Sequence, residues 1–430
     1  MILQNIILFS ILCLCSTSFA AQEQAFLDQP RSDQPSQTED LKEETSPQPV
    51  PRNTNSAFSP QDFGITLSAD IKNEYWSVVN GGVQKGSNHL LNADLTIAAD
   101  LGTLAGLSDA QFFVHFLANN GASISGNVGD IQMVSNIEGY RTVKLYQCWF
   151  EQSFPSVDLS FLIGVFDLNS EFYVTPSSAL FLNGSHGVGI DLGQSGLNGP
   201  SIFPNTSVAV RLRYAPEDNL SFSAALFDGR PGAPDDCNSF DLSLNGQDGY
   251  FLIGETALEE SGAFKYAAGV WYYTGAFADI CAVDGLEEYF ERKDNAGAYL
   301  LFDRSLYSEP EGGIGGMNMF VRFGMTNDHV NVVRSHVGGG LTYLGPISGR
   351  DEDELGYAFA YASFGTDFHK LNRFYGLSTS AFEAAHELTY RGVLTPWLAL
   401  QYNVQYIMNP SASVDVNDAV VHGLRVEISL

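Results

Sequence analysis

The side chains best suited to bind a small molecule alternate with apolar ones in short runs. Arg211 and Arg213 do so in 208–214, and Trp149 and Glu151 do so in 145–154. Period-two alternation is typical of a strand with one apolar face. An Arg facing hydrocarbon at mid-depth costs roughly 2–4 kcal/mol and a Glu less, so we expect the charged residues, and Trp149 by its parity with Glu151, on a water-facing surface. There they could hydrogen-bond a solute, or they could simply pair with one another.

A second group of polar residues stands in two Gly- and Asn-rich segments between strand-like runs. Asp167, Asn169 and Glu171 open the segment 168–204, and Asp130 lies in 128–139. Long loops without structure of their own tend to be functional. We expect 168–204, and next 128–139, to fold inward beside the strands. The alternative is an exterior lid.

Catalytic and metal-binding motifs are weak. His386-Glu387 begins like a zinc-protease motif, but no second His stands four places on. No C-x-x-C spacing occurs, so we expect no metal, cofactor or catalytic residue. The acidic run 351–354 is expected to be a solvated turn, and Gly338–Gly340 to relieve crowding in a strand.

The N-terminus has the features of an export signal. An apolar run ends in small residues before Ala21, which predicts a signal peptide at 1–20. Residues 21–62 are acidic and rich in Pro and Gln, so we expect a disordered leader. No later stretch of about 20 apolar residues occurs, so residues 63–430 would cross a membrane as a β-barrel or not at all.

Export also bears on the cysteines. Cys13 and Cys15 would leave with the signal peptide, and Cys148 has the parity of the apolar face, together with Tyr146. We predict a disulfide between Cys237 and Cys281, which an oxidising compartment permits.

Alternating runs continue to the C-terminus and predict an all-β fold, a transmembrane antiparallel β-barrel of about sixteen strands. The expected starts lie near residues 64, 89, 110, 142, 157, 205, 219, 249, 263, 295, 316, 333, 355, 382, 397 and 420. Connections after even-numbered strands are mostly short and those after odd-numbered strands mostly long. This asymmetry is typical of short periplasmic turns and long extracellular loops.

The composition agrees with a barrel. The chain has 42 Gly, 30 Phe and 19 Tyr, which suits strands, turns and aromatic girdles. Its formal charge of -29 excludes nucleic acid as an expected partner, because phosphates would be repelled. Acidic loops would also disfavour acidic solutes.

Several segments resemble the OprB-type carbohydrate-selective porins. They are VGDIQMVSNIEG at 128–139, LYQCWFEQSF at 145–154, GVFDLNSEFYVTPSSALFLNGSHG at 164–187, ALFDGRPG at 225–232 and LTPWLALQYNVQYIMNP at 394–410, followed by GLRVEISL. The resemblance covers roughly 64–430 and implies a sixteen-stranded barrel in the bacterial outer membrane that passes sugars by facilitated diffusion. The chain departs from the family in its acidic leader and in ending at Leu430 instead of an aromatic residue.

We therefore expect a non-enzymatic outer-membrane channel for passive, sugar-selective diffusion. Its expected partners are a carbohydrate or other small polar solute, outer-membrane lipid and the outer-membrane assembly machinery. The candidate constriction residues are Trp149, Glu151, Arg211, Arg213, Asp167, Asn169, Glu171 and Asp130. The alternatives are a channel for other solutes such as amino acids or dicarboxylates, an outer-membrane barrel hydrolase, and an adhesin or lectin.

Overall fold

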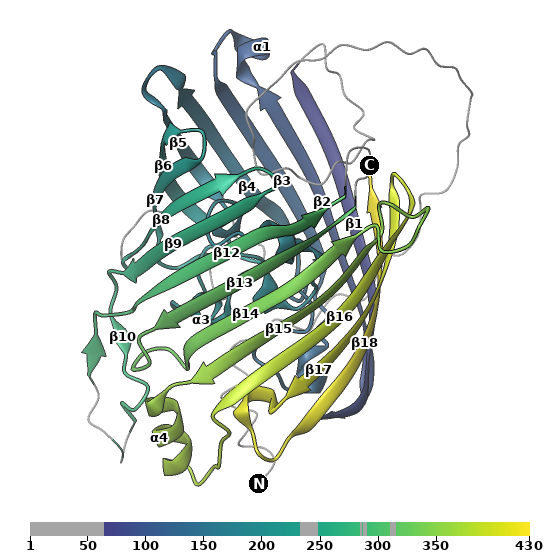
Figure 1. Ribbon diagram of the computed structural model, residues 1–430. Helices are drawn as coiled ribbons and strands as arrows, with labels where there is room; N and C mark the ends of the chain where they lie inside the picture. The colour runs from purple at the N-terminus through teal and green to yellow at the C-terminus, as the bar shows by residue number, and fades with distance from the viewer. Residues whose placement is uncertain (1–63, 233–247, 284–285, 287–289, 310–314) are drawn as a thin grey trace, which may run out of the picture. The chain divides into compact units, whose positions relative to one another are not determined.

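Sixteen strands close into one antiparallel barrel. The computed structural model describes residues 64–232, 248–283, 286, 290–309 and 315–430. Within them each barrel strand pairs with the strands before and after it along the chain, and β1 pairs with β18 to close the ring (Figure 1). The predicted signal peptide (1–20) and leader (21–62) lie outside the described residues and stay predictions.

The barrel strands are β1 (Ile65–Gly82), β2 (Gly86–Asp100), β3 (Ala110–Asn120), β4 (Arg141–Phe154), β5 (Leu159–Phe166), β6 (Ser207–Glu217), β7 (Leu220–Asp228), β8 (Tyr250–Glu260), β9 (Phe264–Tyr273), β12 (Ala296–Ser308), β13 (Gly316–Thr326), β14 (Val333–Leu344), β15 (Glu354–Phe364), β16 (Phe382–Thr395), β17 (Leu398–Met408) and β18 (Asn417–Ser429). A small separate sheet pairs β10 (Phe277–Ala278) with β11 (Glu291–Arg292). The helices are α1 (Leu101–Ala105), α2 (Ser125–Val128), α3 (Ile190–Gly193) and α4 (Thr366–Phe374), with 3-10 turns η2 (Pro155–Val157), η3 (Leu168–Ser170), η4 (Pro176–Leu180), η5 (Gly184–His186) and η6 (Pro410–Ala412).

The predicted strand starts are confirmed. The largest differences occur at β2, expected near 89 and beginning at Gly86, and at β18, expected near 420 and beginning at Asn417. Alternation locates the strands well because every barrel strand has one face toward the outside and one toward the interior.

The two ends of the barrel differ as the alternating loop lengths predict. At one end, the turn end, β1 begins, β18 ends and most connections are short. At the other, the loop end, lie the connections 121–140, 167–206, 229–249, 274–295 and 365–381. The short connections of β1 to β2, of β13 to β14 and of β17 to β18 at the loop end are exceptions.

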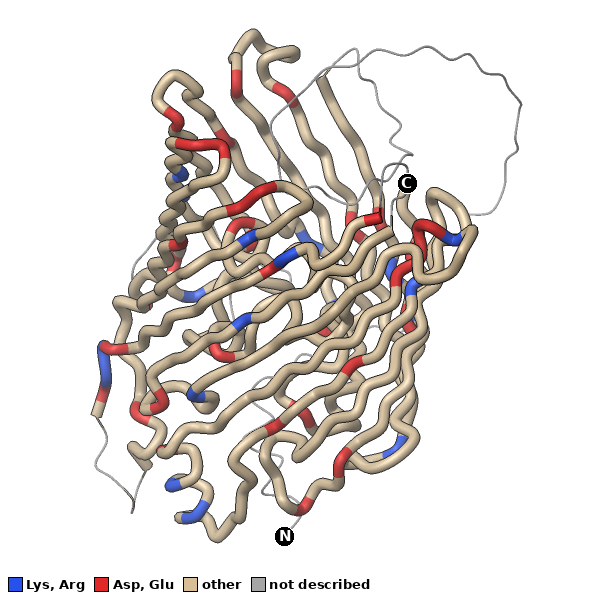
Figure 2. The backbone as a smooth tube through the Cα atoms, in the orientation of Figure 1, with Lys and Arg blue, Asp and Glu red and all other residues tan. Residues whose placement is uncertain are grey.

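The outward face is apolar and exposed. Leu212 is 52% exposed, and its neighbour Arg211, which points inward, is 3% exposed. Ile163 and Phe302, on the outward faces of β5 and β12, are 47% and 46% exposed. Figure 2 shows Asp and Glu at the turns of both ends. No helix of the described residues is long and apolar enough to span a membrane.

The barrel seam is held by both backbone and side chains. The Leu430 N–H donates to the carbonyl of Ala69 (2.8 Å), so the backbone hydrogen bonds of the seam continue one residue beyond β18. Further along the seam, Glu74 of β1 and Arg425 of β18 are register partners and form a buried ion pair inside the barrel.

The predicted lipid-facing position of Tyr146 is wrong. The pairing of β3 with β4 shifts register between His115 and Phe116, where Tyr146 is the extra residue. Such a bulge breaks the alternation of side chains. Tyr146 is therefore buried inside, where its hydroxyl donates to Asp167 (2.5 Å).

Candidate functional site

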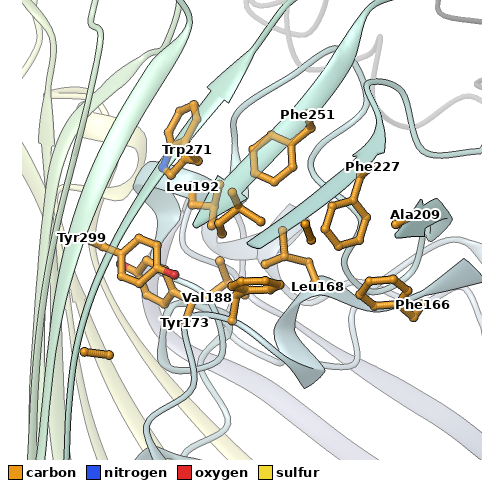
Figure 3. Close-up of a cluster of buried hydrophobic side chains, with 14 of the residues drawn as sticks. Phe166, Leu168, Tyr173, Val188, Leu192, Ala209, Phe227, Phe251, Trp271 and Tyr299 are labelled. Carbon is orange, nitrogen blue, oxygen red and sulfur yellow. The ribbon is translucent and has the colours of Figure 1, made fainter. Parts of the chain in front are cut away.

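The connection between β5 and β6, the 167–206 loop, lies inside the barrel. α3, which belongs to this loop, appears in Figure 1 behind the strands of the wall. Apolar side chains of the 167–206 loop pack against inward-facing aromatic side chains of the wall (Figure 3). The loop contributes Leu168, Tyr173, Val188 and Leu192, and the wall contributes Phe227, Phe251, Trp271 and Tyr299. The prediction that this segment folds inward is confirmed.

Glycine in the wall makes room for the loop. A Cβ atom on Gly356 of β15 would lie 2.7 Å from Leu180 Cδ2 and 2.8 Å from Phe181 Cζ. On Gly340 of β14 it would lie 2.7 Å from Phe320 Cε1, which itself packs against Phe181. The close approach of loop and wall therefore requires glycine at position 356, and glycine at position 340 leaves room for the ring that Phe181 contacts.

Wall carboxylates hold the loop through its backbone. Glu255 accepts from the Tyr173 N–H (3.0 Å), Asp303 from Ser177 (2.7 Å), and Glu387 from Leu182 (2.7 Å) and Asn183 (3.0 Å). All three carboxylates are buried. A buried charge needs such partners, since leaving it unpaired costs several kcal/mol.

Arg322 of β13 holds the same loop by donating to carbonyl and hydroxyl groups of the loop. The guanidinium donates to Ser185 O (3.2 Å) and Gly187 O (3.0 Å), and to the hydroxyls of Ser178 (2.7 Å) and Thr175. Its side chain is fully buried. The planar group thus fixes η4 and η5 relative to the wall.

The connection between β3 and β4, the 121–140 loop, also lies inside, as predicted for 128–139. Glu383 accepts from the N–H groups of Ile131 (3.0 Å) and Gln132 (3.1 Å), and Gln405 donates to Val134 O (2.7 Å). The two loops are joined by backbone hydrogen bonds, Asn136 N to Leu182 O (2.7 Å) and Gly184 N to Met133 O (2.8 Å). Together they form one internal layer.

Three of the predicted residues meet at one point of the interior. Arg211 of β6 donates to Glu151 of β4 (2.7 Å) and to Glu171 of the 167–206 loop (2.9 Å), and also to Ser160 (2.7 Å). Within this cluster, burial and the charge of Arg211 have opposite effects on the Glu171 carboxyl. In Glu171, burial raises the pKa against the lowering effect of Arg211. The cluster therefore connects the wall with the loop.

The strip of wall next to this cluster is only half-buried. Trp149 of β4 stacks on Phe113 of β3, with ring centroids 4.9 Å apart. Asp94 of β2 contacts His115 (2.9 Å) and Lys72 (3.5 Å), and its side chain is 14% exposed. By contrast, Glu387 under the loops is 0% exposed. The wall on β2–β4 is thus more accessible than the wall under the loops.

Residues 84–430 match the family model of the carbohydrate-selective porins of the OprB family. The chain belongs to the OprB family. Its barrel is that of an outer-membrane porin.

Individual relatives agree with this assignment. Porin B of Pseudomonas aeruginosa is 24% identical over 369 residues, which is 77% of this chain and 80% of that protein. The putative porin QuiX of Acinetobacter baylyi is 24% identical over 409 residues, 85% of this chain and 89% of that protein. The high-pH structure of Pseudomonas putida OprB has the same fold, with a TM-score of 0.77 at 23% identity over 86% of this chain and 95% of that one.

The other candidate residues have separate places in this OprB-family barrel. Asp167 caps η3 by accepting from Asn169 N (2.7 Å), and Asn169 donates to Phe172 O (3.2 Å). Arg213 pairs loosely with Glu259 (3.5 Å) toward the turn end. Asp130 is buried in the 121–140 loop, and no hydrogen bond reaches its carboxylate within the described residues. Burial and the nearby Glu383 carboxylate raise the pKa of Asp130.

Sequence reasoning missed the residues that hold the loops: Glu74, Glu255, Asp303, Arg322, Glu383, Glu387 and Arg425. The polar parity of their strands places them inside, but alternation does not indicate which segment each one meets. In the sequence, Glu387 stands out only as part of the incomplete His386-Glu387 motif. The strand puts the two side chains on opposite faces, with His386 outside against Tyr357 (2.8 Å).

Two further predictions concern the acidic run 351–354 and the disulfide between Cys237 and Cys281. The acidic run 351–354 is not wholly solvated, because Asp353 is buried and is bound by Arg350, Tyr390 and the N–H of Val393 (3.0 Å). Cys281 is a buried free cysteine, and Cys237 lies outside the described residues. The disulfide between them stays a prediction.

Proposed function

We propose that this chain is a passive channel of the outer membrane for small hydrophilic solutes, with carbohydrates as the preferred class. One observation carries the proposal. The two internal loops are anchored to the wall through buried carboxylates and Arg322, and the accessible wall beside them carries Trp149, Phe113 and Glu151. A fixed narrowing lined by hydrogen-bonding groups is what selective diffusion requires.

The chemistry of this strip suits a sugar. A sugar ring presents an apolar face, which can lie against the aromatic pair, and hydroxyls, which can donate to carboxylates. Arg211 holds Glu151 and Glu171 in place and leaves further lone pairs of their oxygens available. We propose Trp149, Glu151, Glu171 and Arg211 as the residues that the solute meets, and Arg213 as part of the approach from the turn end.

Charge would bias the choice of solute. The chain carries a formal charge of -29, so neutral and cationic solutes are favoured over anionic ones. The exposed apolar outer wall would lie in outer-membrane lipid, and the assembly machinery would insert the barrel. We propose no catalytic activity.

Transport assays test this function directly. In liposome swelling with purified protein, neutral sugars should enter faster than dicarboxylates of similar size. In planar bilayers, the ion current should fall as sugar is added. A barrel that conducts no ions, or one that passes dicarboxylates faster than sugars, would overturn the proposal.

A further inference from the structure

Two connections at the loop end bring a thiol and two carboxylates together. Asp279 and Cys281 belong to the β9–β12 connection, and Asp367 lies in the first turn of α4. One ligand atom from each residue lies within 4.8 Å of the other two. Asp279 and Cys281 are 4% and 0% exposed. None of the three would make a binding site alone, but together they offer a mixed sulfur and oxygen donor set.

Neighbouring groups orient these donors. Asp279 accepts from the Cys281 N–H (2.8 Å) and pairs with Arg292. Asp367 pairs with His329 Nδ1 (2.5 Å), from the short β13–β14 connection. Each carboxylate oxygen that accepts one hydrogen bond keeps a second lone pair. Such outer partners are what metal-ligating carboxylates usually have.

The Cys281 thiol makes one weak hydrogen bond within the described residues. Its Sγ contacts only the backbone carbonyl of Asp367 (3.6 Å) among the hydrogen-bond acceptors of the described residues. A divalent ion between the three donors would stabilise the thiolate and both carboxylates at once.

We propose that Cys281, Asp279 and Asp367 bind a divalent transition-metal ion of the zinc class. Thiolate favours Zn²⁺ over Ca²⁺ or Mg²⁺, and Cys with oxygen ligands leaves a fourth position for water. On binding, the S–H proton passes to solvent and a sulfur–metal bond forms. The ion would tie the β9–β12 connection to α4. The proposal takes the place of the predicted Cys237–Cys281 disulfide, because a sulfur in a disulfide is not a thiolate ligand. This inference does not depend on the transport function.

Cobalt reports a thiolate ligand through its absorption. The full-length protein in detergent, treated with chelator and reductant, is titrated with Co²⁺ alone. We expect a near-ultraviolet charge-transfer band in the wild type, displaced by Zn²⁺ and not by Mg²⁺. Cys281→Ser should abolish the band, and Asp367→Asn should weaken binding at least tenfold.

Cys148→Ser is the matched control, because Cys148 lies on the outward face of β4, and its band should be unchanged. Heat-modifiable mobility on gels checks that each variant is folded. Cobalt binding without the band, or a band that Cys281→Ser retains, would overturn the site. A Cys237–Cys281 disulfide in protein extracted without reductant would do the same, since it would consume the ligand.

Discussion

Replacing Glu387 by Ala should loosen the 167–206 loop. The carboxylate accepts from the N–H groups of Leu182 and Asn183, and from Asn403 Nδ2 (2.6 Å). All four residues are buried or nearly so, and the substitution supplies no acceptor in return. Three donors would then lie in the interior without a partner.

The magnitude follows from the cost of buried donors. Each unpaired donor costs about 1–3 kcal/mol, so three cost at least about 3 kcal/mol. We use this lower bound because removing the buried carboxylate also removes its own desolvation cost. About 3 kcal/mol changes an equilibrium by roughly a hundredfold, so a displaced loop should become populated far more often.

Single-channel recording in planar bilayers measures the effect. We expect a larger mean conductance and frequent current fluctuations in Glu387→Ala, with Glu387→Gln intermediate because it retains one acceptor oxygen. Glu259→Ala is the matched control on another inward-facing strand position. Its half-exposed pair with Arg213 (3.5 Å) should contribute about 0–1 kcal/mol.

An unchanged conductance in Glu387→Ala would contradict this role of the carboxylate. If Glu387→Ala folds, as its heat-modifiable mobility would show, and conducts with the same amplitude and noise as the wild type and Glu259→Ala, the carboxylate does not hold the loop. The narrowing would then have another cause.

Three further predictions concern single side chains. Arg211→Met leaves the charges of Glu151 and Glu171 uncompensated, so reversal potentials across a KCl gradient should shift toward cation selectivity. Arg304 lies exposed on the outward face, so Arg304→Met should not shift them. Trp149→Ala removes a stacking surface worth about 0.5–1.5 kcal/mol, so sugar block of the ion current should weaken several-fold while conductance to salt does not fall. The raised pKa of Asp130 means that its carboxyl ionises first in the unfolded chain as the pH rises above 3.8. The contribution of Asp130 to stability should therefore be greatest below that pH and fall as the pH approaches the raised pKa of the folded form. Thermal unfolding in detergent should show a smaller pH dependence in Asp130→Asn, and an identical profile would contradict the assignment.

The strands were predictable because a membrane barrel imposes one rule on every strand. Leu212 and Arg211 show it: one is exposed outside and the other buried inside. The rule fails at Tyr146, where one extra residue inverts the faces and no local feature of the sequence announces the bulge.

The internal contacts were predictable only in part. The polar parity placed Arg211 and Glu151 on the interior, and the segment opening at Asp167 suggested an inward loop with Glu171. Which wall residue meets which loop residue depends on closure of the whole ring. Glu383 and Ile131 are 252 positions apart, and no period in the sequence relates them.

The wall holds both loops mainly by their peptide groups, which every residue except proline provides in full. Loop side chains outside the buried cluster with the wall can therefore be exchanged while the loop backbone keeps its path, whereas the wall carboxylates cannot. A barrel built this way could acquire a new solute preference through a handful of loop substitutions, without redesign of the scaffold.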